Sequence, residues 1–221
     1  MKNALCISGQ PRFYNECYKY LYNNIIKPNN CDVFIHCWCD DEFIKDEIIK
    51  LFQPVSWLFE KQKEHLAPEP YGYYKRRAGA PTEVQFSMFY SIKEAMLLKF
   101  THEIKNNFKY ENVVKSRFDC AILDLLLLTN YNNDKVYFPD VLRHKGVLCD
   151  YFNFGESTKM DIFSKTYYNL HNYHEKGIGL CGENMSIHHL KINGIQTEGI
   201  NISTFLMRDE KLNNKQFGKK F

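Results

Sequence analysis

The sequence predicts an α/β fold: a three-layer α/β/α sandwich around a mixed, mainly parallel sheet, in one domain spanning residues 1–221. Two observations predict it. Short apolar segments alternate along the chain with longer segments in which apolar residues recur at helical spacing. The segment DVFIHCW at 32–38 is apolar nearly throughout, as a strand is when both faces are buried in a parallel sheet.

The first half of the chain contains three candidate strands, at 4–8, 32–38 and 55–60. Helical spacing of Cys17, Leu21 and Ile25 predicts a helix over 13–26, which the segment KPNN at 27–30 ends. A second helix is expected from 41 to 52, and Pro54 closes it.

Residues 62–80 combine proline, glycine, tyrosine and basic residues, so we expect a long loop there. Thr82 and Gln85 have capping-box spacing and predict a long helix that runs to about residue 105. Helix N-termini attract anions, which makes Gln85 a candidate nucleotide-binding residue. The loop before this helix is a candidate lid over a ligand, through Tyr73, Tyr74, Arg76 and Arg77.

The second half continues the alternation of strands and helices. Strands are expected at 112–119, 135–138, 151–154 and 201–207. Helices are expected at 159–171 and 183–193, the second ending at Gly194 as helices commonly do.

Composition excludes several classes of protein. The net charge of +3 is too weak to indicate nucleic-acid binding, and no stretch reaches the ~18 apolar residues of a membrane span. The eight cysteines form no CxxC pair and several lie in apolar runs, so we expect reduced thiols and a cytoplasmic location.

Polar clusters follow three of the predicted strands: SGQPR at 8–12, the end of DVFIHCW at 36–38, and KSRFD at 115–119. In open α/β sheets, ligands bind outside the carboxyl ends of the strands. These clusters are therefore expected to meet at one edge of the sheet.

The first cluster offers a glycine and a cation. Gly9 would let backbone approach a ligand closely, and the Arg12 guanidinium can pair with a phosphate. The alternative is an ordinary strand-to-helix turn with a surface arginine.

The third cluster places Lys115, Arg117 and Asp119 on one face of an extended segment. One interpretation is a buried ladder of ion pairs. The other is a diphosphate site, in which Asp119 holds a divalent metal, Mn²⁺ or Mg²⁺, and the cations neutralise the remaining charge.

Five segments in order resemble one family: ISGQPR, DVFIHCW, VVKSRFD, DYFNFGESTKMDIF and GENMSIHHL. Together they resemble small GT-A-type glycosyltransferases of large DNA viruses, including chloroviruses that glycosylate their capsid protein, and of bacterial polysaccharide loci. The resemblance runs from about residue 5 to 208. It implies a GT-A, Rossmann-like fold that moves a sugar from a nucleoside-diphosphate sugar, with UDP expected, to a glycan or glycoprotein, such as a viral capsid glycan in the host cytoplasm.

The resemblance also implies roles for particular residues. The nucleotide would be lined by Ser8, Gly9, Gln10 and Arg12, with His36 and Trp38 beside the base or ribose. Arg117 and Asp119 stand where such enzymes carry an Asp-x-Asp metal motif. Arginine in place of the first acid puts strict metal dependence in doubt: either Arg117 replaces part of the metal's charge, or Asp119 suffices.

Sugar transfer releases a diphosphate, which requires positive charge from a metal or from Arg12, Lys115, Arg117 and Arg208. An inverting enzyme also needs a general base, for which the candidates are Glu183, Glu156 and Asp150. A retaining enzyme needs none, and the sequence does not choose.

Two other functions remain open at this point. A nucleotidyltransferase or another nucleotide-dependent enzyme could use a similar sheet, although SGQPR is only a shortened form of its glycine-rich basic loop. A non-catalytic nucleotide- or sugar-binding module would keep Arg12 and Asp119 without needing Glu156 and Glu183. A methyltransferase is disfavoured, because no glycine-rich loop followed by a strand-end acid is present.

Overall fold

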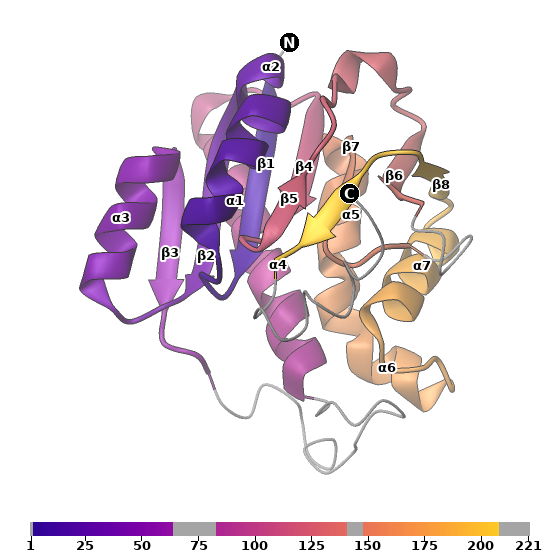
Figure 1. Cartoon of the computed structure of the whole chain (residues 1–221). Coiled ribbons are helices and arrows are strands. Elements are labelled where there is room, and N and C mark those ends of the chain that lie inside the picture. Colours follow the sequence, from indigo (N-terminus) through magenta and orange to yellow (C-terminus); the bar gives the residue numbers. More distant parts are fainter. Residues whose placement is uncertain (1, 64–82, 141–147, 208–221) are drawn as a thin grey trace, which may run out of the picture.

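The computed structural model describes residues 2–63, 83–140 and 148–207, and these form one seven-stranded sheet with helices on both faces (Figure 1). The strand order is β3-β2-β1-β4-β7-β6-β8, and only β7 runs antiparallel to its neighbours. The predicted mixed, mainly parallel α/β class is confirmed. The strands are β1 Asn3–Gly9, β2 Cys31–Trp38, β3 Ser56–Glu60, β4 Asn112–Ser116, β6 Lys135–Pro139, β7 Asn153–Glu156 and β8 Gln196–Ile200.

Helices form a layer on each face of the sheet. One face is covered by α1 Tyr14–Leu21 with its π-helical extension Tyr22–Ile26, by the short α2 Lys27–Asn29, and by α3 Glu42–Phe52. A two-stranded antiparallel sheet of β5 Cys120–Ile122 and β9 Thr204–Leu206 lies on the same face. The other face is covered by α4 Glu83–Asn106, α5 Ser157–Ser164, the 3-10 helix Lys165–Asn169, α6 Leu170–Glu175 and α7 Gly182–Ile192.

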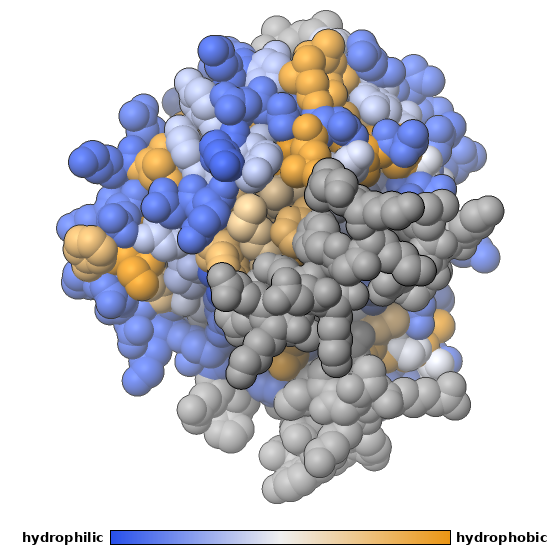
Figure 2. Space-filling model, in the orientation of Figure 1, coloured by the Kyte–Doolittle hydropathy of each residue, from blue (hydrophilic) through white to orange (hydrophobic). Residues whose placement is uncertain are grey.

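Strand β1 shows why the sheet is central. Ala4 and Cys6 point into the core on the α4 side, whereas Leu5 and Ile7 point into the core on the α1 side, and all four side chains are buried. A strand with two buried faces must be apolar throughout, as its sequence predicted. On the face that Figure 2 shows, hydrophilic residues predominate among the coloured ones, with a smaller band of hydrophobic residues between them.

Several element boundaries differ from the expectations. The strand expected at 112–119 ends at Ser116, because the chain turns with the Cys120 amide donating to the Arg117 carbonyl at 3.4 Å, and β5 then joins a separate sheet. The helix expected at 159–171 is divided into α5, a 3-10 segment and α6. The strand expected at 201–207 is β9 alone, and β8 before it was not predicted.

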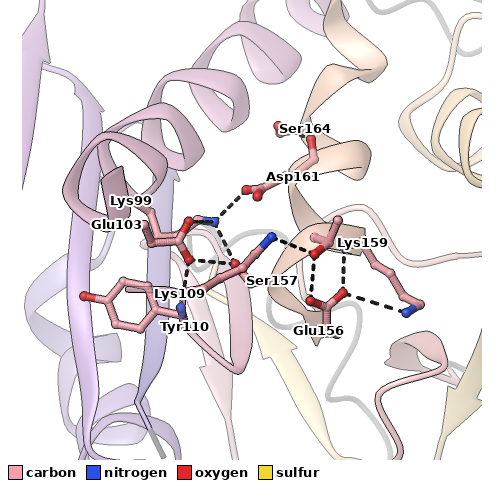
Figure 3. Close-up of polar contacts among 10 residues, drawn as sticks. Lys99, Glu103, Lys109, Tyr110, Glu156, Ser157, Lys159, Asp161 and Ser164 are labelled. Carbon is pink, nitrogen blue, oxygen red and sulfur yellow. Dashed lines mark hydrogen bonds and ion pairs between the residues drawn. The ribbon is translucent and has the colours of Figure 1, made fainter. Parts of the chain in front are cut away.

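A buried lysine joins α4 to α5 away from the strand ends that carry the polar clusters. Lys99 is fully buried and its ammonium donates to Glu103 (3.0 Å), Ser157 (2.8 Å) and Asp161 (2.6 Å), as Figure 3 shows. Glu103 in turn accepts from the Tyr110 amide at 2.9 Å. Every charge in this cluster therefore has a partner within the protein.

None of the helices within the described ranges combines the length and apolarity that a membrane crossing requires.

Candidate functional site

The strand order reverses between β1 and β4, and a cavity lies at their carboxyl ends. From β1 the chain proceeds to β2 and β3 on one side and then returns to β4 on the other. Such a switch point is where open α/β sheets bind ligands. The cavity measures about 670 Å³, and its lining within the described residues is Ser8, Gly9, Gln10, Arg12, Trp38, Gln62, Lys63, Glu83, Val84, Ser87, Met88, Lys115, Arg117 and Asp119.

The end of β1 forms the first wall of this cavity. Ser8 is buried, and Gly9 has a φ of +115°, a backbone conformation that side chains other than hydrogen adopt only with strain. The Arg12 amide then donates to the Gln10 carbonyl at 2.8 Å, which closes a tight turn and leaves the Arg12 side chain exposed at the cavity. The structure thus brings together the four residues expected from the SGQPR segment.

Hydrogen bonds tie three separate segments around the cavity. The Gln10 amide group donates to Gln62 at 3.3 Å, and Gln62 donates to Ser87 at 2.6 Å. These residues follow β1, follow β3 and lie in the first turns of α4, respectively. The rim is therefore held by side chains as well as by the sheet.

Trp38 faces the cavity, and His36 does not line it. The His36 ring is fully buried, with Nδ1 2.6 Å from Ser91 and Nε2 2.9 Å from Glu60. Burial lowers the pKa of His36, so a neutral ring is favoured. The structure therefore does not bring His36 to the cavity with Trp38, although the two rings are in contact at 4.7 Å.

The indole of Trp38 is positioned by packing, but its polar atom is unsatisfied. The ring stacks on Tyr90 at 5.3 Å and the residue is only 6% exposed. Its Nε1 is buried and, among the described residues, finds no hydrogen-bond acceptor. A buried donor without an acceptor is uncommon in proteins, which makes this indole a candidate donor for a ligand in the cavity that Trp38 lines.

Lys115 lines the cavity, although the residue is only 1% exposed. Its ammonium donates to the backbone carbonyl of Asp150. Burial lowers the pKa of Lys115 to about 8, the nearby Arg117 also lowers it, and the Asp150 carboxylate opposes this shift. Lys115 is thus a buried cation near neutral pH, and it can bind an anion.

Arg117 and Asp119 form a two-point ion pair across the turn after β4. Arg117 Nε donates to Asp119 Oδ1 at 2.8 Å, and Nη2 donates to Oδ2 at 2.5 Å. Asp119 is 4% exposed, whereas the Arg117 side chain is 29% exposed. Burial opposes the charge of Arg117, but Asp119 outweighs it and raises the arginine pKa.

This pairing does not fit a divalent metal at Asp119. Both carboxylate oxygens already accept from the guanidinium, and a metal would have to displace a cation that is held at two points. Across the ranges that the structure describes, no three His, Cys, Asp or Glu side chains are grouped as metal ligands. The residues present therefore disagree with the expected Mn²⁺ or Mg²⁺ site.

The N-terminus of α7 packs close to Asp150 and to the cavity residue Met88. A side chain at Gly182 would meet Met88 Cε at 2.8 Å and Asp150 Oδ2 at 2.9 Å, so the helix start packs against a cavity residue and against Asp150. Glu183 is the next residue in the first turn of this helix. Neither carboxylate lines the cavity directly. The charge of Asp150 acts on the cavity residues Lys115 and Arg117, whereas Glu183 is near the cavity only through its neighbour Gly182.

Glu156 lies at the opposite end of the strands from the cavity, so the structure does not bring this expected general base to the site. Because β7 runs antiparallel, its last residue pairs with Asn112 at the start of β4 rather than with the end of that strand. Glu156 accepts from Thr158 at 2.8 Å and from the Lys159 amide at 3.3 Å, which caps α5 (Figure 3). It is a helix cap.

Two further expected residues behave differently from the prediction. Gln85 is 3% exposed and does not line the cavity, because it faces the core from α4 while Ser87 and Met88 of the same helix face the ligand space. Arg208 and the proposed lid residues Tyr73, Tyr74, Arg76 and Arg77 lie outside the described residues.

The sequence reasoning missed cavity residues that follow β3. Lys63 pairs with Glu60 at 2.5 Å and places its ammonium over the Tyr90 ring at 4.4 Å. Burial opposes the charge of Glu60, yet hydrogen bonds from Lys63 and His36 outweigh it and lower the Glu60 pKa. Reading the end of the third strand in the same way as the others would have found Lys63 and Gln62.

The fold and this site define a class: a doubly wound α/β protein with a cationic cavity at its switch point. No protein-family model matches the sequence, and no curated protein matches it. Among solved structures, the chain is similar to a Desulfovibrio desulfuricans G20 protein provisionally assigned as a nucleotide-diphospho-sugar transferase. The TM-score is 0.48 at 10% identity, over 90% of this chain and 79% of that one.

Proposed function

We propose that the protein is a glycosyltransferase that takes its sugar from a nucleoside-diphosphate sugar, with UDP as the carrier, and transfers it to a glycan or glycoprotein. The observation that carries this proposal is the cavity at the β1–β4 switch point. Its described lining holds four cations, Arg12, Lys63, Lys115 and Arg117, against two acids. An excess of cations in a preformed cavity suits a diphosphate.

The walls suit the remainder of a sugar nucleotide. Gly9 keeps the end of β1 free of a side chain, so a ligand can approach the backbone there. Trp38 offers an aromatic surface and an N–H donor, which a base or a sugar can use. The volume of about 670 Å³ lies within the range of small-molecule sites.

Transfer breaks the bond between the anomeric carbon and the diphosphate oxygen and forms a bond from that carbon to an acceptor oxygen. The electron pair of the broken bond leaves on the diphosphate, where Lys115 and Arg117 stabilise the charge. In an inverting reaction the acceptor proton passes to a carboxylate. The candidates for this base are Asp150, whose charge acts on Lys115 and Arg117, and Glu183, which follows the Gly182 that packs against Asp150.

Nucleotide titration followed by an activity assay tests the proposal. We expect calorimetry to detect binding of UDP, GDP or CDP, and we expect slow release of the diphosphate from the corresponding sugar nucleotide without an acceptor. No binding of any nucleotide at millimolar concentration would overturn the proposal. Cleavage of a nucleoside triphosphate with no turnover of sugar nucleotides would instead indicate a nucleotidyltransferase.

A further inference from the structure

We propose that this site binds the diphosphate directly through Lys115 and Arg117 without a divalent metal, and that Asp119 is a positioning residue for Arg117. The inference rests on the proposed function, because it concerns how the same cavity holds a diphosphate. It assigns Asp119 a role different from that of a metal ligand.

The carboxylate of Asp119 is fully engaged by Arg117. Asp119 is 4% exposed and both of its carboxylate oxygens accept from Arg117, at 2.8 and 2.5 Å. A guanidinium held at two points is fixed in direction as well as in place. Asp119 therefore sets where Arg117 points.

Both cations keep N–H donors that a phosphate can accept from. A guanidinium has five N–H groups, of which two are used by Asp119, so three remain for a phosphate. The Arg117 side chain is 29% exposed and lines the cavity, which lets these donors reach a ligand. The Lys115 ammonium has three N–H groups and gives one to the Asp150 carbonyl.

The charges around this site favour an anion over a metal ion. Asp119 acts on Arg117, and the charge of Asp150 acts on both Arg117 and Lys115. A metal ion placed between Asp119 and Asp150 would meet these two cations, and like charges at short range in a buried site repel strongly. The same positions favour phosphate oxygens, which are anionic.

Binding of pyrophosphate and of UDP should be measured by calorimetry, with the purified chain, in buffer with EDTA and in buffer with Mn²⁺. Pyrophosphate tests the cation site without depending on the base. We expect binding in EDTA with a Kd within about twofold of that in Mn²⁺, since a metal that bridged protein and phosphate would change the Kd by about tenfold or more.

Matched variants separate positioning from metal binding. Asp119→Asn should weaken binding about tenfold, and equally with EDTA and Mn²⁺, because Arg117 loses its charged partner. Asp161→Asn is the control, because Asp161 is another acid that pairs with a lysine: its carboxylate, 15% exposed, lies 2.6 Å from the Lys99 ammonium. It should leave pyrophosphate affinity unchanged.

The outcomes distinguish the inference from the proposed function. Tight binding only in Mn²⁺, with loss of that dependence in Asp119→Asn, would overturn the metal-free inference and leave the glycosyltransferase proposal standing. No binding of nucleotide or pyrophosphate in either buffer would defeat both. The comparison of EDTA with Mn²⁺ uses the unaltered protein, so it decides the question even if a variant fails to fold.

Discussion

Lys115 lies in an environment unlike that of an ordinary surface cation. It is almost fully buried at the end of β4, and burial brings its pKa down to about 8. Binding of an anion favours the charged form of such a lysine. Ligand affinity should therefore depend on pH near this value.

We predict that the affinity for UDP falls as pH rises from 7 to 9. Above the pKa of about 8 of the free protein, Lys115 must regain a proton on binding, which costs up to about tenfold in affinity per pH unit. Calorimetry at pH 7, 8 and 9 measures this. Lys115→Met should bind weakly with a flatter profile, whereas Lys135→Met, altered at the start of β6, should keep the original slope. A flat profile for the unaltered protein would contradict the prediction.

The indole N–H of Trp38 is expected to donate a hydrogen bond to the ligand. Trp38→Phe keeps an aromatic ring against Tyr90 but removes the unsatisfied Nε1–H. We expect affinity for the sugar nucleotide to fall by about three- to tenfold, the value of one hydrogen bond, with no loss of melting temperature in the free protein. Trp57→Phe on β3, a residue that is 45% exposed, is the control. Equal affinity of Trp38→Phe and the unaltered protein would show that the indole donor is unused.

At the scale of elements, the end of β1 determines the shape of the cavity wall. The strand is buried on both faces and its last residue, Gly9, turns the chain with a φ of +115°. The space around a Cβ at this position is open to 4 Å, so the glycine is required by its backbone angle and not by crowding.

We predict that Gly9→Ala lowers the free energy of unfolding by about 1–2 kcal/mol, from backbone strain alone. Gly194→Ala is a matched control, because Gly194 also has a positive φ of +71° and open space, but it follows α7 away from the cavity. Urea unfolding should show similar losses for both variants. Nucleotide affinity should fall only for Gly9→Ala, and an equal fall in both would contradict the role of Gly9 in the cavity.

At the scale of the whole molecule, a buried charge cluster joins the helical layer behind the sheet. Lys99 from α4 bonds Ser157 and Asp161 of α5, and Glu103 accepts from the chain that enters β4. Removing one member of such a cluster leaves the remaining charges uncompensated in a dry environment.

We predict that Lys99→Met lowers the free energy of unfolding by about 3–5 kcal/mol, because Glu103 and Asp161 lose their cation. Urea unfolding at pH 7 measures the change. Lys135→Met, which breaks an exposed pair with Glu198, should change it by about 1 kcal/mol or less. A loss of that small size for Lys99→Met would mean that the cluster contributes little.

The sequence by itself determined the features that depend on neighbours along the chain. Two-sided apolarity at 32–38 marked a central strand, and the rule that ligands lie at strand ends grouped SGQPR, Trp38 and KSRFD around one cavity. These predictions hold because residues at the ends of parallel strands meet wherever the sheet forms.

Only the tertiary structure decided what depends on strand direction and on partners distant in sequence. Glu156 left the site because β7 runs antiparallel, and His36 left it because Ser91 and Glu60 hold its ring in the core. The pairing of Asp119 with Arg117 depends on the turn that ends β4 early. The alternating charges of KSRFD identify the side chains that can meet. The folded chain decides that both carboxylate oxygens of Asp119 accept from Arg117, and that Lys115 and Arg117 keep donors for a ligand.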